Sequence, residues 1–377
     1  MGRGTRGSGK GIGETLASRA LPGLMGSVRV VENLPLASMT TLGLGGPARR
    51  VIAPDREDDL IDAVREIDAN RGRLLVVGGG SNLVVGDDGF DGTVLRMSTR
   101  GVESESPTAP AGRPVRHLTA LAGEPWDDLV ARCVADGLTG VECLAGIPGL
   151  VGAVPMQNVG AYGQEVSDTI VWVEALDRDT GALRIIKAAE CDFAYRASRF
   201  RGSDRWAITR VRFELTAGPD SRPIRYAELA KALGIPDGEV APLAQVRETV
   251  LALRRGKGMV VDASDPDSRS AGSFFTNPLV DPTTFADLRE RVGEGVTIPA
   301  WPADHGRTKL SAGWLIERAG FARGHVAGPV GISNKHALAL VHRGGGTTRE
   351  LLELAATIQD AVRTRLGVEL HPEPVFV

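Results

Sequence analysis

Residues 144–163 constrain this chain more than any other stretch. Their sequence, LAGIPGLVGAVPMQNVGAYG, holds five glycines, two prolines and the adjacent amides Gln157 and Asn158. The apolar residues follow neither a period of 3.6 nor a period of 2, so an ordinary helix or strand is not expected. Glycines at this density let backbone N–H groups approach a ligand without obstruction by side chains. We therefore expect the stretch to wrap a phosphate-bearing cofactor; the alternative is a glycine-rich surface loop.

A second glycine-rich loop, GGGSN at residues 78–82, follows a predicted buried strand at 74–77. It lacks the Lys-Ser/Thr pair of a P-loop. It also continues into further strands, whereas a Rossmann turn leads directly into a helix. A loop between strands can still bind pyrophosphate through its N–H groups, and a tight β-turn is the alternative.

Length and composition limit the remaining possibilities. A chain of 377 residues predicts two or three domains. The net charge of −3 gives no electrostatic footprint for nucleic acid. The three cysteines form no metal-binding or redox pattern, which predicts reduced thiols in the cytoplasm, and no apolar run reaches membrane-spanning length. Residues 1–26 predict a disordered extension, with Met25 as an alternative start.

Periodicity and turn signals predict the main elements outside these loops. A Thr347–Glu350 capping-box pattern predicts the start of the last helix, which should end at Gly367. The other expected elements are helices through residues 60–67, 126–134, 246–257 and 310–315, a hairpin over 170–186, and strands at 337–341 and 368–370.

Five separated motifs together resemble the UDP-N-acetylenolpyruvoylglucosamine reductases (MurB) of peptidoglycan precursor synthesis. The resemblance covers residues 34–377, and a segment RYAEL at 225–229 is similar to the tyrosine segment of the family's type I members. The motifs are GGGSN at 78–82, AGIPG through QNVGAYG at 145–163, FAYRASRF at 193–200, AGSFF with a following NP at 271–278, and HPE at 371–373.

The resemblance implies an α+β chain with a vanillyl-alcohol-oxidase (PCMH-type) FAD-binding fold. That fold would consist of two α+β subdomains, at residues 27–97 and 98–241. A separate α+β substrate-binding domain would occupy residues 242–368, and a tail at 369–377 would return to the active site. The loop between Lys257 and Ser273 looks longer than in the shortest family members.

The activity that the resemblance implies is a two-step reduction. NADPH, the co-substrate, would reduce FAD, and flavin N5 would then pass a hydride to the enol ether of UDP-N-acetylglucosamine enolpyruvate, giving UDP-N-acetylmuramate. None of the six histidines has a recognisable flavin-attachment context, so FAD is expected to be non-covalent. The expected protein is a cytoplasmic monomer that binds no metal, nucleic acid or membrane.

Three residues carry the chemistry in this reading. Ser273 would donate the proton, Arg196 would clamp the substrate carboxylate, and Glu373 would polarise it, with a pKa raised by the neighbouring anion. Taken singly, they have ordinary alternatives: a turn serine, a surface arginine and a charged tail residue. The resemblance also implies cofactor contacts from Gly78, Gly79, Gly80, Ser81, Asn82, Gly146, Ile147, Pro148, Gly149, Gln157, Asn158 and Ala161, and substrate contacts from Tyr226, Arg254, Lys257 and Asn277.

Two other functions remain compatible with the glycine-rich loops. One is a flavin oxidase of the same fold class that acts on a sugar alcohol or aldonolactone with oxygen as acceptor. It would have no need for Ser273, Arg196 and Glu373 together. The other is a protein that binds flavin or nucleotide without turnover.

Overall fold

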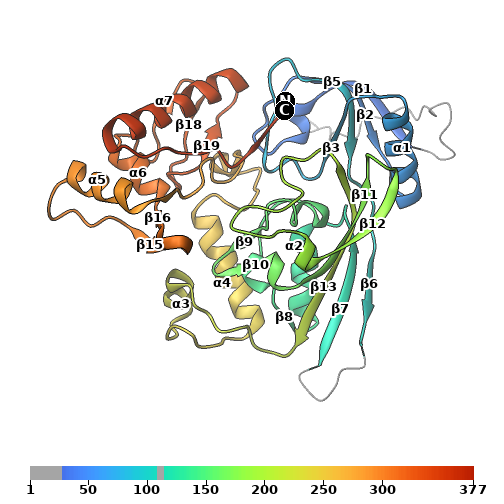
Figure 1. The fold of residues 1–377 in the computed structure, drawn as a ribbon, viewed down its shortest axis with the longest axis horizontal. Coiled ribbons are helices and arrows are strands. Elements are labelled where there is room, and N and C mark those ends of the chain that lie inside the picture. Colours follow the sequence, from blue (N-terminus) through green and yellow to red (C-terminus); the bar gives the residue numbers. More distant parts are fainter. Residues whose placement is uncertain (1–27, 108–113) are drawn as a thin grey trace, which may run out of the picture.

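The computed structural model describes residues 28–107 and 114–377; the extension predicted at 1–26 lies outside the described residues. Figure 1 shows three groups of elements that follow one another along the chain. We call them the N-terminal unit (residues 28–97), the central unit (the described residues of 98–256) and the C-terminal unit (residues 271–370).

The N-terminal unit is a mixed sheet covered by one amphipathic helix. Strand β5 lies between β2 and β3 and is parallel to both, while β1 adds to the edge as an antiparallel neighbour of β2. Helix α1 connects β2 to β3 and turns its apolar face, centred on Leu60 and Val64, into the core. The elements are β1 (Arg29–Pro35), β2 (Pro47–Ala53), α1 (Glu57–Ala69), β3 (Leu74–Val77), β4 (Leu83–Val84) and β5 (Phe90–Arg96).

The central unit is built on a larger antiparallel sheet. Its order is β12-β11-β13-β7-β6, with the short β8 also pairing to β13. The predicted hairpin is confirmed as β11 and β12. The elements are β6 (Val102–Glu105), β7 (Val115–Leu121), α2 (Trp126–Ala135), β8 (Leu138–Thr139), β9 (Gly160–Ala161), β10 (Gln164–Glu165), β11 (Ile170–Asp177), β12 (Ala182–Lys187), β13 (Trp206–Ala217), α3 (Ala227–Leu233) and α4 (Leu243–Gly256).

The C-terminal unit packs three helices against two small sheets. Its longest helix, α7, carries the predicted capping box at Thr347 and Glu350 and ends at Gly367, whose φ of 70° is the left-handed conformation that glycine favours. The elements are β14 (Leu279–Val280), α5 (Pro282–Val292), β15 (Ala300–Pro302), β16 (Thr308–Leu310), α6 (Ala312–Arg318), β17 (Val326–Ala327), β18 (Val330–Ile332), β19 (Leu340–His342) and α7 (Thr348–Leu366), and β20 (Val375–Phe376) follows in the tail.

The last residues of the chain leave the C-terminal unit and join the N-terminal one. Strand β20 pairs in parallel with β4, which directly follows the 78–82 loop. The Val375 N–H donates to the Asn82 carbonyl at 2.9 Å, and the Gly86 N–H donates to the Val377 carbonyl at 2.8 Å. Figure 1 shows the C-terminus lying beside the N-terminal unit. The tail therefore passes the glycine-rich loop, carrying Glu373 with it.

The predicted domain boundary at residue 242 would place helix α4 in the substrate-binding domain, but α4 packs against the central unit. Its buried face, including Val246 and Val250, belongs to the same apolar core as α2 and the central sheet. The core of the C-terminal unit begins only at Ala271 and is completed by Leu42 and Leu44 of the N-terminal unit. Packing thus assigns α4 to the central unit, because its apolar stripe matches that core.

Three further expectations in the C-terminal unit need correction. Leu310 ends strand β16 instead of starting a helix, and α6 begins at Ala312 with the Ser311 hydroxyl as its cap. The strand predicted at 337–341 is Leu340–His342, and residues 368–370 form no strand. All three segments are short and apolar. In such segments the periodicity of the sequence does not distinguish a helix, a strand or an extended loop.

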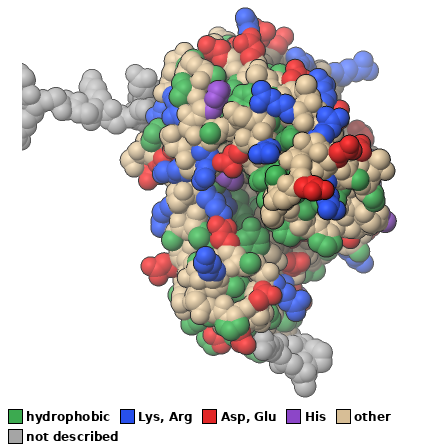
Figure 2. Space-filling view, turned by 90° about the vertical axis from the view of Figure 1, so that its left-hand side faces the viewer, with side chains coloured by type: hydrophobic (Ala, Val, Ile, Leu, Met, Phe, Trp, Pro, Cys, Tyr) green, Lys and Arg blue, Asp and Glu red, His purple; other side chains and the backbone are tan. Residues whose placement is uncertain are grey.

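The surface carries charges of both signs. Figure 2 shows Lys and Arg side chains interspersed with Asp and Glu over one face of the molecule. Within the described part of the chain, none of the helices combines the length and apolar character needed to cross a bilayer.

Candidate active site

The two glycine-rich loops lie directly against each other. A Cβ added at Gly79 would lie 2.8 Å from the Cα of Gly149. The Ser81 hydroxyl donates to the Pro148 carbonyl at 3.1 Å. Gly80 has a φ of 65° and its carbonyl accepts the Thr41 N–H. The close approach of Gly79 to Gly149 is possible only because neither residue has a side chain. The two loops therefore pack backbone against backbone, and the 144–163 stretch is not a flexible surface loop.

A cavity of about 370 Å³ opens beside these loops. Gly78 and Gly79 line it together with Thr40, Thr41, Arg96 and Arg269, among others. Hydroxyls, exposed loop backbone and two guanidinium groups suit a phosphate. The cradle therefore fits part of a dinucleotide such as FAD.

Not every predicted cofactor residue is free to reach such a ligand. The Gly146 N–H donates to Asp127 at 2.7 Å, so this N–H is already hydrogen-bonded within the protein. The Asn158 side chain is buried and donates to Glu165 at 2.7 Å and to the Ala194 carbonyl at 3.3 Å. These two polar groups hold the loop in shape instead. Ile147 is half-buried, and Ala161 lies in β9.

Gln157 connects the cofactor loops to the predicted catalytic residues. Its amide oxygen accepts from Asn82 at 2.9 Å, and its amide nitrogen donates to the Glu373 carboxylate at 3.1 Å. On its other side, Glu373 pairs with Arg196, with 3.0 Å between Nε and Oε1. Arg196 in turn donates to the Gly160 carbonyl at 2.9 Å. The side chains of four residues from separate segments, Asn82, Gln157, Glu373 and Arg196, thus form one connected network.

The protonation of Glu373 depends on its burial. Burial raises the pKa of the Glu373 carboxyl, and the charges of Arg196 and Arg201 oppose that rise. The carboxyl is therefore easier to protonate than an exposed glutamate. In its protonated form it would be a hydrogen-bond donor beside a fixed cation.

The tail also brings Glu373 next to the segment that contains Ser273. The Glu373 N–H donates to the Phe274 carbonyl at 2.9 Å, and the Thr276 N–H donates to the His371 carbonyl at 3.0 Å. Phe274 and Phe275 are both buried and stack edge-on. Ser273, which is half-buried, directly precedes these two buried rings. The backbone of the tail thus connects the Arg196–Glu373 pair to the segment that contains Ser273.

His336 is the side chain that contacts Ser273. Its Nε2 lies 3.4 Å from the Ser273 hydroxyl. Burial, and then the charge of Lys257, lower the pKa of His336 to about 4, so the imidazole is neutral near pH 7. A neutral imidazole can donate one N–H to that hydroxyl.

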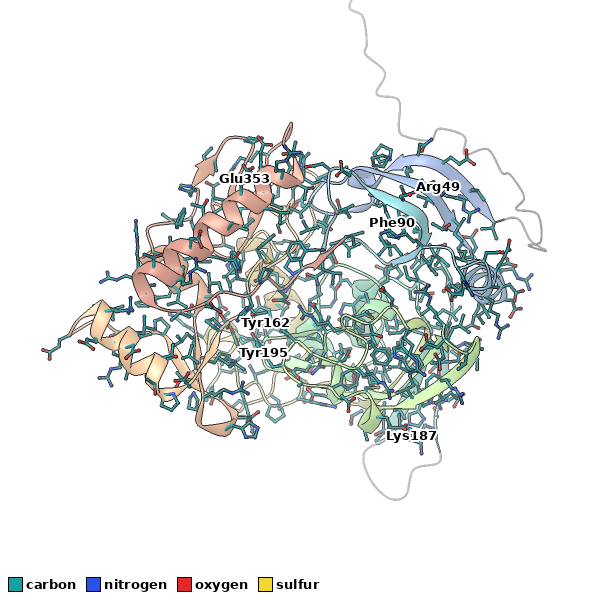
Figure 3. The ribbon with its side chains drawn as sticks, turned by 45° about the horizontal axis from the view of Figure 1, so that its top comes forward. Arg49, Phe90, Tyr162, Lys187, Tyr195 and Glu353 are labelled. Atoms are coloured by element: carbon teal, nitrogen blue, oxygen red, sulfur yellow. The ribbon has the colours of Figure 1, made fainter. Side chains whose placement is uncertain are left out.

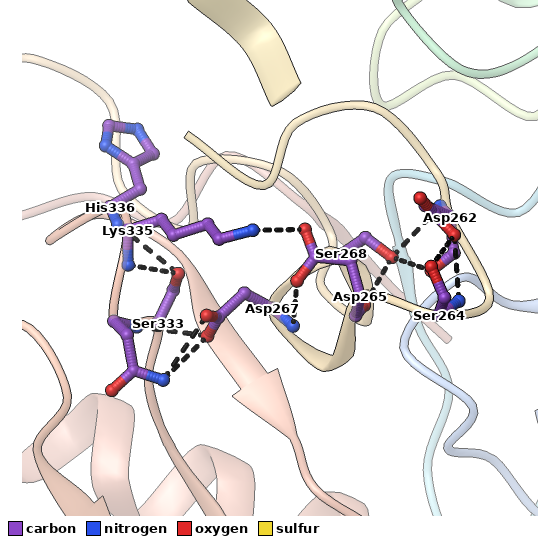
Figure 4. Close-up of polar contacts among 9 residues, drawn as sticks. Asp262, Ser264, Asp265, Asp267, Ser268, Ser333, Lys335 and His336 are labelled. Atoms are coloured by element: carbon purple, nitrogen blue, oxygen red, sulfur yellow. Dashed lines mark hydrogen bonds and ion pairs between the residues drawn. The ribbon is translucent and has the colours of Figure 1, made fainter. Parts of the chain in front are cut away.

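A polar network fixes the turn that carries His336. Lys335 pairs with Asp265 at 2.8 Å, and the Asn334 N–H donates to Asp267 at 3.0 Å (Figure 4). Ser333 accepts the His336 N–H at 3.3 Å. The acidic residues lie in the long loop after Lys257, so this loop anchors the turn beside Ser273.

The predicted substrate residues form a second cluster at the edge of the site. Lys257 pairs with Glu228 at 2.6 Å and lies 5.7 Å from the ring centre of Tyr162. Tyr162 packs edge-on against Tyr226, with 5.4 Å between the ring centres. The Arg254 Nε is buried with no hydrogen-bond partner among the described residues. A cation with an unused donor beside the half-buried Tyr162 and the exposed Tyr226 suits an anionic nucleotide sugar.

Asn277, predicted as a substrate contact, has its side-chain oxygen hydrogen-bonded within the protein. Its side-chain oxygen accepts the Ala312 N–H at 3.0 Å at the start of α6. Tyr195 lies between two cations, 5.3 Å from Arg196 and 5.2 Å from Lys309, measured to its ring centre. Figure 3 shows Tyr162 and Tyr195 near the middle of the molecule. The Asn277 side chain therefore holds the start of α6 in place through its hydrogen bond to Ala312.

Comparison with known proteins agrees with this geometry. A family model described as FAD binding domain matches residues 48–186. A model of the UDP-N-acetylenolpyruvoylglucosamine reductase C-terminal domain matches residues 265–377. The UDP-N-acetylenolpyruvoylglucosamine reductase of Thermobifida fusca is 53% identical over 350 residues, which is 92% of this chain and 97% of that protein. The chain belongs to the UDP-N-acetylenolpyruvoylglucosamine reductase family.

Other UDP-N-acetylenolpyruvoylglucosamine reductases agree in sequence and in fold. The reductase of Saccharopolyspora erythraea is 52% identical, over 91% of this chain and 94% of that protein. The crystal structure of the reductase (MurB) from Thermus caldophilus matches with a TM-score of 0.61 at 25% identity, covering 93% of this chain and 98% of that one. The predicted family and α+β FAD-binding fold are confirmed. The chain is an FAD-dependent oxidoreductase of peptidoglycan precursor synthesis.

Three side chains in the site were missed by sequence reasoning. Tyr162 stands inside a recognised motif but was not singled out, and Arg201 directly follows another motif. His336 lies in a loop with no periodic signal. Adjacency to a motif could have suggested the first two, whereas His336 reaches Ser273 only through the packing of the C-terminal unit.

The contact between the two glycine-rich loops gives a direct test of the cofactor cradle. We expect Gly79→Ala to force the loops apart, because its Cβ would lie 2.8 Å from Gly149. Overpacking of this kind costs roughly 1–3 kcal/mol of stability, and FAD retention should fall with it. The ratio of flavin to protein absorbance after purification, together with urea unfolding, measures both effects. Gly218→Ala, where an added Cβ meets open space, is the matched control. A Gly79→Ala protein with full FAD and unchanged stability would contradict the cradle.

Proposed function

We propose that the chain reduces UDP-N-acetylglucosamine enolpyruvate to UDP-N-acetylmuramate with NADPH, in the cytoplasm, using non-covalent FAD. The observation that supports this most directly is the Arg196–Glu373 pair, which hydrogen-bonds the glycine-rich loops through Gln157 and the segment of Ser273 through the Glu373 backbone. When bound, FAD would supply the hydride that adds to the β carbon of the enol ether. Charge then builds on the α carbon and on the attached carboxylate, so the protein must stabilise an anion and deliver a proton.

Arg196 and Glu373 suit the stabilisation of that charge. Arg196 is a permanent cation whose position is fixed by the Gly160 carbonyl and by Glu373. A guanidinium can hold a carboxylate with two parallel hydrogen bonds. Glu373, in its protonated form, would donate a further hydrogen bond to the same carboxylate. Donors already in place need no reorganisation as the charge develops.

Ser273 suits the proton transfer. Its hydroxyl lies in a segment whose neighbours, Phe274 and Phe275, are buried. Limited water and fixed orientation let a weak acid such as a hydroxyl protonate a strongly basic carbanion. The neutral His336 can donate an N–H to the resulting alkoxide. At the edge of the site, Lys257, Arg254 and Tyr226 would hold the diphosphate and sugar.

NADPH consumption by the purified protein tests the proposal. We expect anaerobic NADPH oxidation to continue beyond the one equivalent that reduces the FAD only when the enolpyruvyl sugar nucleotide is added, because that substrate is the final acceptor of the electrons. Flavin that is reduced by a sugar alcohol or aldonolactone and reoxidised by oxygen, with no NADPH oxidation dependent on the sugar nucleotide, would favour the oxidase alternative. Bound flavin without turnover under either condition would favour a binding protein.

The state of the cofactor is tested separately. Among the described residues, the lining of the cavity beside the glycine-rich loops includes neither cysteine nor histidine, and the three free cysteines are buried. Mild acid or heat precipitation should therefore release a yellow, soluble flavin. Flavin retained in the washed precipitate would contradict non-covalent binding.

A further inference from the structure

Arg201 connects the backbones of two predicted catalytic residues. Its Nη1 donates to the Arg196 carbonyl at 2.6 Å, and its Nη2 donates to the Glu373 carbonyl at 2.8 Å. Glu373 lies 172 positions further along the chain. A single guanidinium thus spans the point where the tail meets the turn that carries Arg196.

The turn at Arg196 requires such support. Ala194 and Ala197 exchange two backbone hydrogen bonds, of 3.1 and 3.0 Å, which place Tyr195 and Arg196 at the tip of a tight turn. Arg196 has a φ of 53°, in the left-handed region that a residue with a Cβ adopts only when neighbouring contacts enforce it. The bond from Arg201 to the Arg196 carbonyl is one of those contacts.

The tail has a comparable need. Between the end of α7 at Leu366 and strand β20 it has no helix and only an isolated bridge. The Glu373 N–H is held by Phe274 and its carbonyl by Arg201. Both backbone groups of Glu373 are therefore fixed, one by the Ser273 segment and one by the Arg196 segment.

We propose that Arg201 is a positioning residue that sets the distance between Arg196 and Glu373 for the protonation half of the reaction. The inference rests on the proposed function. The planar guanidinium presents two donors at a fixed separation, which a lysine ammonium cannot reproduce across two carbonyls. Arg201 uses its donors on backbone, so it can act without touching the substrate.

The charge of Arg201 gives the proposal a second, independent effect. Together with Arg196, it lowers the pKa of Glu373 against the rise caused by burial. The other groups that face the Glu373 carboxyl are the neutral amide of Gln157 and the phenol of Tyr195. Removing the Arg201 charge should therefore raise the pKa of Glu373 further and keep it protonated to higher pH.

Arg201→Met and Arg201→Lys in the holoenzyme test the proposal. Flavin reduction by NADPH and flavin reoxidation by the enolpyruvyl substrate are followed separately by stopped-flow absorbance across pH. For Arg201→Met we expect reoxidation to slow by about 10²-fold, the effect of a misplacement near 1 Å, and the alkaline fall in its rate to move to higher pH. Flavin reduction should be unchanged. Arg201→Lys should also slow reoxidation but leave the alkaline fall in place, because the charge is kept.

Arg199→Met is the matched control. Arg199 lies on the same segment and also donates to a backbone carbonyl, that of Glu190 at 2.8 Å, away from the site. It should behave as wild type in both half-reactions. Arg201→Met with wild-type reoxidation, or with equal losses in both half-reactions, would overturn the proposal. If the wild-type enzyme itself fails to reoxidise with the substrate, the proposed function fails instead.

Discussion

Ser273→Ala should leave the reduction of flavin by NADPH unchanged and slow its reoxidation by UDP-N-acetylglucosamine enolpyruvate by roughly 10²–10⁴-fold, the usual contribution of a positioned proton donor. The hydroxyl is the only part of the side chain that is lost. In the described part of the chain, the hydrogen-bond partner of this hydroxyl is His336, at 3.4 Å. The damage should therefore be confined to the step that needs a proton.

Anaerobic stopped-flow measurement of the two half-reactions checks this result. Ser264→Ala removes a hydroxyl from the exposed part of the neighbouring loop, where it donates to Asp262, and serves as the control. Equal slowing of both half-reactions would show that Ser273 supports the fold or the flavin site instead of the proton transfer.

Glu373→Gln should change the pH dependence of reoxidation. Burial raises the pKa of Glu373, and the proposed role needs its protonated form. As the pH rises through that raised pKa, the wild-type enzyme should lose reoxidation rate. A glutamine amide donates a hydrogen bond at every pH, so the alkaline fall assigned to Glu373 should disappear in the variant. Glu373→Ala removes the donor altogether and should slow reoxidation by about 10²–10³-fold, as for loss of one oxyanion donor.

Rates of flavin reoxidation measured over a pH series separate these outcomes. Glu353→Gln, on the exposed face of α7 (Figure 3), is the control and should match wild type. An alkaline fall that persists unchanged in Glu373→Gln would assign the titration to another group and contradict the role of Glu373.

Much of the fold could be predicted because its signals are local. The strand at 74–77, the hairpin and the capping box at Thr347 each depend on neighbouring residues, and the structure contains all three. Helix α4 was assigned to the wrong unit because an apolar stripe shows that a helix is buried but not against which core.

The candidate site was predictable only in part for a related reason. Motifs identified Arg196, Ser273 and Glu373 as candidates, and contacts between distant segments connect the Arg196–Glu373 pair to the backbone next to Ser273. His336 enters the site through packing alone, and although Arg201 directly follows a motif, no periodicity or spacing relates it to Glu373. Asn158 and Asn277 lie in recognised motifs, yet their amides hydrogen-bond the protein, a use that composition does not distinguish from ligand binding.

A single-turnover experiment tests the central proposal most directly. The holoenzyme is reduced anaerobically with one equivalent of NADPH, freed of NADP⁺, and mixed with UDP-N-acetylglucosamine enolpyruvate while the flavin spectrum and the sugar nucleotides are followed. We predict full reoxidation of the flavin together with formation of one UDP-N-acetylmuramate per flavin. Flavin that stays reduced with the substrate, and is reoxidised only when oxygen is admitted, would contradict the account.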